Sequence, residues 1–417
     1  MSGPKVVRIV TREERVATCS GLLGRLESAL QDFERAARRN GALTEADVQN
    51  MRSRYEQLKQ ALAADRFDEV ERVAPIEIDF VRREQEQRQA DAIRKETLRR
   101  RVKKRTREIE SQLRAIARAP ANDGRATEQQ LELAKKLKET EDDRSFERWL
   151  AAHPSLADTE TTRIEQQLAE LSFLLDAGVV EDLERRLQAV EQETSAHQRT
   201  MRLDSLTLEL ARSVKKARDR DAAKSRLRSL AEELKAIGSA GAVQRAASVL
   251  AAIDDSPQAL ASLEADTVKA LTAERESLAA HARRNAVLKG LATLGYQVHE
   301  GLETAWVQSG RVVVKRPTQP GYGVEVGGKS ESGRLQVRVV AIRGSGDVAD
   351  SARDKDAERI WCSDFSKLQK QIAEDGGGLV IEKALGVGET PLKVVEDAEM
   401  SAAEAHAPPR ERALPRP

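Results

Sequence analysis

Cysteine is scarce in this chain, which has only Cys19 and Cys362 among its 417 residues. Two cysteines so far apart in the sequence do not make the framework of a disulfide-stapled domain. No CxxC pair is present to hold zinc. Because so few thiols fit a reducing compartment best, we expect a cytoplasmic protein.

Long apolar runs are also missing. No segment approaches the roughly 18 to 20 apolar residues that a membrane-spanning helix needs. The N-terminal residues contain no long apolar stretch and run directly into the charged residues Arg12, Glu13 and Glu14. They therefore do not resemble a signal peptide, and the sequence predicts no membrane span.

Aromatic residues make up only 3% of the chain, whereas 33% of the residues are charged. A composition dominated by Ala, Glu, Arg, Leu and Gln is typical of long helices and coiled coils. The 70 basic and 69 acidic residues nearly cancel. The chain as a whole is therefore not a polybasic nucleic-acid binder, although local stretches of charge need separate attention.

Patterns that carry catalysis or bind metals are absent as well. The histidines are scattered without HxxxH or HExxH spacing, and no GxSxG occurs. Cys362 lies between Trp361 and Ser363 on a predicted helix, where a structural thiol is expected more often than a nucleophile. The sequence predicts no enzyme, no cofactor and no metal site.

Long helices account for most of what is present. Thr11 and Glu14 fit a capping box, and apolar residues at helical spacing predict an antiparallel hairpin over the next fifty residues. From Arg82 to Ala119 neither Gly nor Pro interrupts a polar helical arm of about 55 Å. A second helical region follows, in which Ser256 and Pro257 fit the start of another helix.

The composition changes near residue 286, where Gly, Val and aromatic residues become frequent. Period-2 alternation with regular turns predicts a β-meander. Its expected strands are Tyr296–His299, Ala305–Gln308, Arg311–Lys315, Tyr322–Val326 and Leu335–Ile342. A helix from about Asp354 to Asp375 is expected to cover the apolar face of this sheet, and Leu379–Glu382 to add a final strand.

The predicted fold is therefore mainly α, with elongated helical hairpins or a coiled coil followed by a small α+β domain. The expected divisions are an N-terminal arm (1–10), a helical hairpin with a long polar arm (11–124), a second helical region (125–285), the α+β domain (286–396) and a disordered tail (397–417). Within the N-terminal arm, Lys5–Val10 fits either a short strand or an extended segment.

One phosphate-loop pattern, GxxxxGK[ST], occurs at Gly323, Gly328, Lys329 and Ser330. A phosphate loop needs a buried strand before it and a helix after it. Here a strand is expected on both sides, so a hairpin turn accounts better for these letters. Nucleotide binding at 323–330 is thus the weakest of the functional hypotheses.

A basic run gives the nucleic-acid hypothesis. Nine Lys or Arg residues occur with a single acid, Glu96, at Arg94, Lys95, Arg99, Arg100, Arg101, Lys103, Lys104, Arg105 and Arg107. Such residues contact backbone phosphates, but no aromatic residue is interleaved for base stacking. The alternative is a solvated helix neutralised by acidic helices of the same chain.

The favoured hypothesis is a coiled-coil scaffold or adaptor. Its helices would self-associate or space partners, and its α+β domain would dock a protein such as an ATPase or an effector. Trp306 and Trp361 are expected in the core. Either of them, or Tyr322, becomes a candidate partner anchor if it is exposed.

Overall fold

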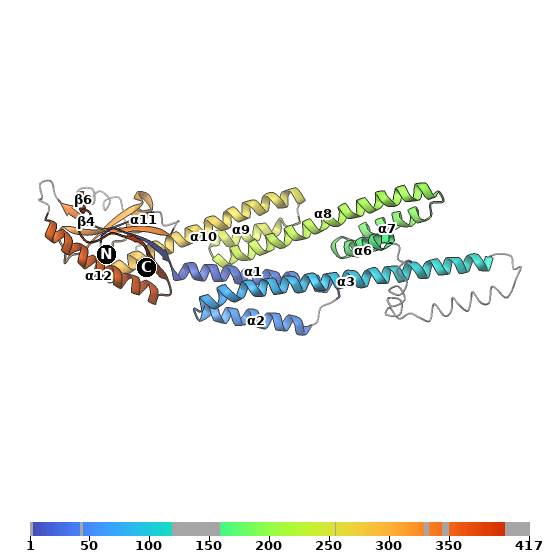
Figure 1. The fold of residues 1–417 in the computed structure, drawn as a ribbon, viewed down its shortest axis with the longest axis horizontal. Helices are drawn as coiled ribbons and strands as arrows, with labels where there is room; N and C mark the ends of the chain where they lie inside the picture. Colours follow the sequence, from blue (N-terminus) through green and yellow to red (C-terminus); the bar gives the residue numbers. More distant parts are fainter. Residues whose placement is uncertain are drawn as a thin grey trace, which may run out of the picture.

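The computed structural model describes residues 3–41, 45–118, 159–254, 256–328, 333–343 and 350–396. It confirms the predicted fold class, because a long bundle of helices carries a small α+β region at one end (Figure 1). We call the helical part the stalk. The head is the β-sheet with the helices packed on it. None of the described helices is long and apolar enough to cross a bilayer.

The stalk helices run back and forth along the long axis of the molecule (Figure 1). Helix α1 leaves the head, α2 returns, and α3 continues to the far end. Helix α8 begins at that far end and returns, and α10 enters the head. The stalk helices are α1 (Arg12–Arg39), α2 (Glu45–Ala63), α3 (Phe67–Arg118), α6 (Thr159–Leu174), α7 (Ala177–Glu191), α8 (Ala196–Ile237), α9 (Ala240–Ala251) and α10 (Pro257–Thr293).

Local sequence signals set the helix starts. The Glu14 N–H donates to Thr11 Oγ1 at 3.3 Å, and the Thr11 N–H donates to the Glu14 carboxylate at 2.8 Å, so the predicted capping box is present. Ser256 caps α10 through the N–H of Ala259, with Pro257 at the first helical position as predicted. Helices α3 and α8 contain 52 and 42 residues, which corresponds to roughly 78 and 63 Å.

Three apolar clusters hold the stalk together. The first joins α1, α2 and α3, the second joins α6, α7 and α8, and the third joins α8, α9 and α10. Because α8 contributes to two of them, it connects the far end of the stalk with the part next to the head.

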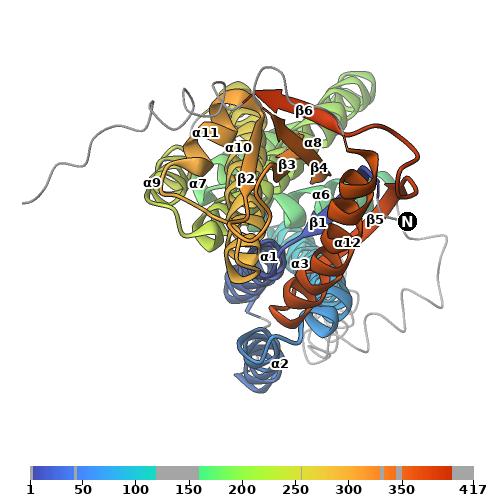
Figure 2. The same ribbon diagram turned by 90° about the vertical axis from the view of Figure 1, so that its left-hand side faces the viewer.

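The head contains a six-stranded sheet with the order β2-β3-β4-β1-β5, and β6 pairs in parallel with β4. The predicted antiparallel meander is formed by β2, β3 and β4. Figure 2 looks at the molecule from this end, with the strands and α12 in the foreground. The strands are β1 (Lys5–Val10), β2 (Arg311–Lys315), β3 (Tyr322–Gly327), β4 (Arg334–Arg343), β5 (Gly378–Ala384) and β6 (Lys393–Glu396).

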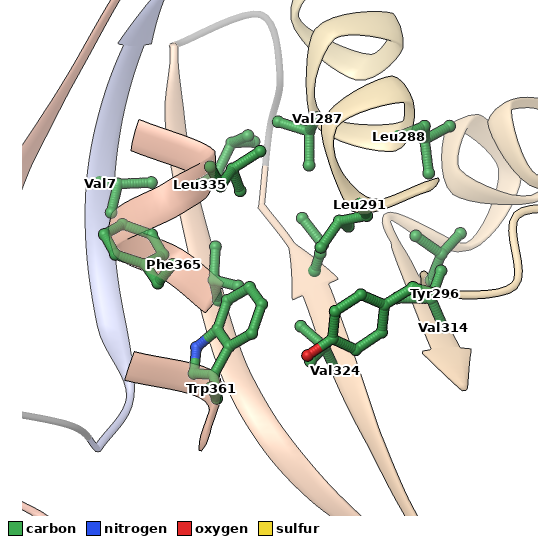
Figure 3. Packing of buried hydrophobic residues seen from close by; sticks show 14 of the residues in the cluster. Val7, Val287, Leu288, Leu291, Tyr296, Val314, Val324, Leu335, Trp361 and Phe365 are labelled. Atoms are coloured by element: carbon green, nitrogen blue, oxygen red, sulfur yellow. The ribbon is translucent and has the colours of Figure 1, made fainter. Parts of the chain in front are cut away.

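The head core lies between the sheet and three helices, which are the end of α10, α11 (Leu302–Ser309) and α12 (Ser351–Glu374). In Figure 3, Trp361 and Phe365 of α12 point toward Leu291 of α10 and Val7 of β1. The expectation that the helix near 354–375 covers the apolar face of the sheet is therefore confirmed.

Of the two alternatives for Lys5–Val10, a strand or an extended arm, the structure shows a strand, and it lies in the interior of the sheet. Strand β1 pairs with β4 on one side and β5 on the other. The physical reason is its alternation, which buries Val7 and Ile9 against the helices while Arg8 and Val10 remain exposed. The head is thus built from both ends of the chain.

Three further details of the expected head differ from the structure. Tyr296–His299, expected as a strand, forms no helix or strand and connects α10 to α11. Ala305–Gln308, expected as a strand, lies in α11, because Leu302, Ala305 and Trp306 have helical spacing and Gly301 and Gly310 bracket the helix with positive φ. The change of composition near residue 286 falls inside α10, which continues unbroken into the head. The expected disordered tail (397–417) lies outside the described residues.

Candidate functional site

The phosphate-loop letters fall on a β-hairpin. Gly323 lies within β3, and Gly328 follows it with a φ of 111°. Lys329 and Ser330 lie outside the described residues, and the chain resumes directly before β4. The element after the turn is therefore a strand, so a helix N-terminus does not stand behind this loop as phosphate binding requires.

Part of the basic run is used inside the stalk. Arg100 contacts Glu184 of α7 at 2.5 Å, and Lys104 forms an ion pair with Glu191 of the same helix. Both also act on the buried Glu165 of α6: burial raises the pKa of this carboxyl, although Lys104 and Arg100 act to lower it. These contacts favour the interpretation that acidic helices of the same chain neutralise this part of the run.

The rest of the run forms an exposed stripe. Lys95, Arg99, Lys103 and Arg107 are all exposed and recur every four residues along α3. Arg94 is also exposed, with Asp91 3.5 Å away, Arg101 is half-buried, and the side chain of Arg105 lies outside the described residues. The basic residues thus divide into an inward pair and an outward stripe, a division that the sequence analysis did not predict.

A second basic surface lies on α8 and was not singled out from the sequence. A groove between α8 and α10 is lined by basic side chains, by two acids and by an apolar floor. Lys215 pairs with Asp219, Arg226 pairs with Glu264, and Arg220 donates to the Asp254 carbonyl at 3.0 Å. Arg212, Lys216 and Arg220 are exposed and spaced four residues apart. The sequence does contain a pattern that predicts this surface, namely basic residues at four-residue intervals on a helix of otherwise mixed charge.

The aromatic anchors proposed for a partner lie inside the head. Trp306 and Trp361 are only 2% and 1% exposed, so the expectation that they are core residues is confirmed, and they are not surface anchors. Tyr322 is half-buried, and its hydroxyl donates to Asp354 at 2.8 Å.

Strand β5 carries two neighbouring exposed apolar residues of the head. This strand ends the main path of the sheet, with β1 on one side only. Val380 is 64% exposed and Ile381 is 40% exposed. Sequence reasoning found a strand here but not its edge position, because that position depends on the pairing with β1.

Backbone directions show which groups of β5 face outward. The N–H of Ile9 donates toward the β4 side, to Gly333, at 3.0 Å, and Ile9 is the register partner of Leu379. In an antiparallel ladder the N–H and C=O of Leu379 therefore point away from β1, and so do those of Ile381 two residues later. The Gln369 side chain donates to the outward Leu379 carbonyl at 2.9 Å, so part of the edge is already occupied.

Within the described ranges, no group of three or more His, Cys, Asp or Glu side chains is arranged to hold a metal ion. Comparison of this chain with protein-family models, with curated proteins and with solved structures finds no match. The functional argument therefore depends on the geometry of the head and the stalk.

Proposed function

We propose that this chain is a non-enzymatic adaptor. The head binds a partner protein, and the stalk holds that partner at a fixed distance from whatever binds the far end. The observation that carries the proposal is the pair of continuous helices, α3 and α8, which run between the head region and the far end of the molecule (Figure 1). Several interhelical ion pairs and three apolar clusters support the stalk along its length. Such a body holds two binding regions at a defined separation.

The β5 edge is the docking surface that this proposal assigns to the head. A partner that contributes an extended strand would satisfy the outward N–H and C=O of Ile381 and cover Val380 and Ile381. Lys383 and Glu382 on the same strand are charged, which is how proteins limit unspecific pairing at sheet edges. This mode therefore requires a particular strand with complementary charge rather than any apolar segment.

The test is an affinity pull-down of the tagged protein from its native cells, with and without nuclease, followed by mass spectrometry. Wild type is compared with Ile381→Lys and with the matched control Val394→Lys, which alters an apolar residue 50% exposed on β6. A stoichiometric partner that survives nuclease, is lost from Ile381→Lys and is kept by Val394→Lys supports the proposal. A partner retained by both variants contradicts docking at β5.

Self-association through the helices belongs to the same proposal and is measured separately. Light scattering on the purified protein gives its mass, which is compared with the 46.1 kDa of one chain. If the protein has the mass of a monomer over a wide concentration range, self-association is excluded, and the adaptor acts as a single chain.

Nucleic-acid binding is the second candidate function, and the two exposed basic stripes on α3 and α8 favour it. Each stripe presents an exposed basic side chain every helical turn, about 6 Å apart. The charge-reversal variants that test this function leave Arg100 unchanged, because Arg100 supports the contact with α7. Arg99→Glu with Lys103→Glu tests α3, and Arg212→Glu with Lys216→Glu tests α8.

Fluorescence anisotropy with labelled DNA and RNA at several salt concentrations measures the effect. Phosphate contacts predict weaker binding in each double variant and a smaller dependence of log affinity on log salt. Absence of wild-type binding at low salt excludes this function, whereas loss in only one double variant identifies the stripe responsible.

A further inference from the structure

One face of α8 is exposed over a long stretch of the stalk. Leu206, Leu210 and Val214 point away from this face, into the apolar cluster with α6 and α7. The residues on the opposite side follow one another at steps of three, four or seven, which places them on a single face of the helix. All of them are exposed, and they are Met201, Leu208, Arg212, Lys215, Asp219 and Arg226. At roughly 1.5 Å per residue, this face is about 38 Å long.

The part of this face farthest from the head is apolar. Met201 and Leu208 are each 60% exposed, and they lie seven residues apart on the same side of the helix. Both belong to the beginning of α8, which extends past the start of α10 toward the far end of the molecule (Figure 1). Large apolar side chains at heptad spacing are the residues against which a second helix packs.

Toward the head, the same face leads into the groove between α8 and α10. Ala223 of α8 and Leu260 and Ala261 of α10 contribute its apolar floor. Five basic residues and two acids line the rest of the groove, and both acids are already paired, with Lys215 and Arg226. The surface therefore combines an apolar seam with an excess of positive charge.

We propose that this face of α8, together with the groove, binds an acidic amphipathic helix of a partner protein. This binding mode rests on the adaptor function proposed above and names the chemistry of the partner on the stalk. The apolar side chains of the bound helix cover Met201 and Leu208 and enter the groove. Its carboxylates meet Arg212 and Lys216, so the charges of the two surfaces are complementary.

Two other occupants fit this face less well. Two copies of this chain placed face to face along α8 bring the same basic side chains together, which is unfavourable. A nucleic acid uses the basic residues, but α8 contains no Phe, Tyr or Trp on which bases could stack. It also gains nothing from the exposed side chains of Met201 and Leu208. Charge and apolar surface together favour the acidic helix.

Fluorescence anisotropy with labelled synthetic peptides and the full-length protein tests the proposal. The first peptide is a helix of about 25 residues, long enough to follow the face, with leucine at alternating steps of three and four and glutamate on its flanks. The second has the same composition in scrambled order, and the third has lysine in place of each glutamate. We expect the first to bind at least about tenfold more tightly than the others and to weaken as salt is added. Equal affinities for the first two peptides, or no binding of the first, would overturn the proposal.

A neutral double variant separates the acidic helix from a nucleic acid. Met201→Gln with Leu208→Gln removes both apolar anchors and leaves the charge unchanged, so we expect the acidic peptide to bind about tenfold more weakly, which corresponds to about 1.4 kcal/mol. The matched control Ile76→Gln alters a 62% exposed aliphatic residue of α3 and should leave the affinity unchanged. Arg212→Glu with Lys216→Glu should also weaken binding of the peptide. Circular dichroism checks that every variant folds.

The remaining outcomes identify a different occupant and contradict the proposal. If labelled single-stranded DNA binds to wild type and to the glutamine variant alike, and the acidic peptide binds to neither, the occupant is a nucleic acid. If light scattering shows a wild-type dimer that becomes a monomer in the glutamine variant, the occupant is a second copy. An acidic peptide that fails to bind, beside a pull-down partner that is lost from Ile381→Lys, contradicts this binding mode and leaves the adaptor function intact.

Discussion

The head and the stalk both contain buried carboxylates, such as Asp364 in the head and Glu170 in the stalk, but they differ in how their apolar cores are divided. In the head, the 2% exposed carboxylate of Asp364 accepts from Arg316 at 2.5 Å and from Tyr296 at 3.2 Å. The stalk has many ion pairs between exposed side chains, such as Arg186 with Glu209. The head also has one apolar cluster, whereas the stalk has three. A single change should therefore disrupt the whole head but weaken the stalk only locally.

The largest expected effect is that of removing residues 1–10, because the sheet then loses the interior strand that joins β4 to β5. We expect the near-ultraviolet circular dichroism of Trp306 and Trp361 to collapse while most of the helical signal remains. The measurement uses a Trp149→Phe background so that only the two head tryptophans report. An unchanged tryptophan signal would show that the head does not depend on β1.

The second prediction contrasts one buried and one exposed carboxylate. Asp364→Ala leaves the Tyr296 hydroxyl and the Arg316 guanidinium without their partner, and we expect it to lower the free energy of unfolding by about 3 kcal/mol. Glu209→Ala removes a partner of the exposed Arg186, and less than about 1 kcal/mol is expected. Urea unfolding followed by circular dichroism measures both, and equal costs would remove the proposed contrast.

The third prediction concerns close packing within the stalk. A Cβ added at Gly24 would lie 2.9 Å from the Glu232 carbonyl oxygen of α8. Gly24→Ala therefore pushes α1 from α8, and we expect a net loss of about 1 kcal/mol after the gain in helix propensity. Gly178 in α7 has nothing within 4 Å, so Gly178→Ala should stabilise by up to about 1 kcal/mol. Thermal unfolding distinguishes these opposite signs.

The smallest expected effect is a change in pH dependence. Because burial raises the pKa of Glu165 in the folded stalk, its contribution to stability is fully present below the pKa of the unfolded state and is lost as pH rises through the folded value. Glu165→Gln should therefore stabilise the protein near neutral pH, and this gain should disappear at acidic pH. Melting temperatures across a pH series measure it.

The head offers the opposite sign at Glu325. Burial acts to raise its pKa, but hydrogen bonds from Lys393 and Arg338 give a net lowering. Its contribution is therefore present above the unfolded pKa and is lost as pH falls through the folded value. Glu325→Gln should destabilise near neutral pH and have little effect in strong acid. If the stability change depended on pH in the same direction for Glu165→Gln and Glu325→Gln, the contrast between stalk and head would be contradicted.

The local sequence was sufficient to predict those elements whose structure depends on residues close by in the chain. The capping residues Thr11 and Ser256, the meander and the helix over the sheet could all be predicted from spacing and turn residues. The position of β1 could not, because alternation describes a strand without naming its partners. The pairing of Arg100 with Glu184 could not either, since it depends on how α7 packs against α3.

The place of β1 in the sheet also has a consequence for synthesis of the protein. Lys5 pairs with Val337 and with Ala384, and translation at about 5 to 20 residues per second separates these residues by tens of seconds. The first strand therefore leaves the ribosome long before its neighbours exist, and the stalk helices can form in the meantime. A chain interrupted before β5 would carry a stalk without a finished head. Presentation of the head thus reports that translation has continued through β5.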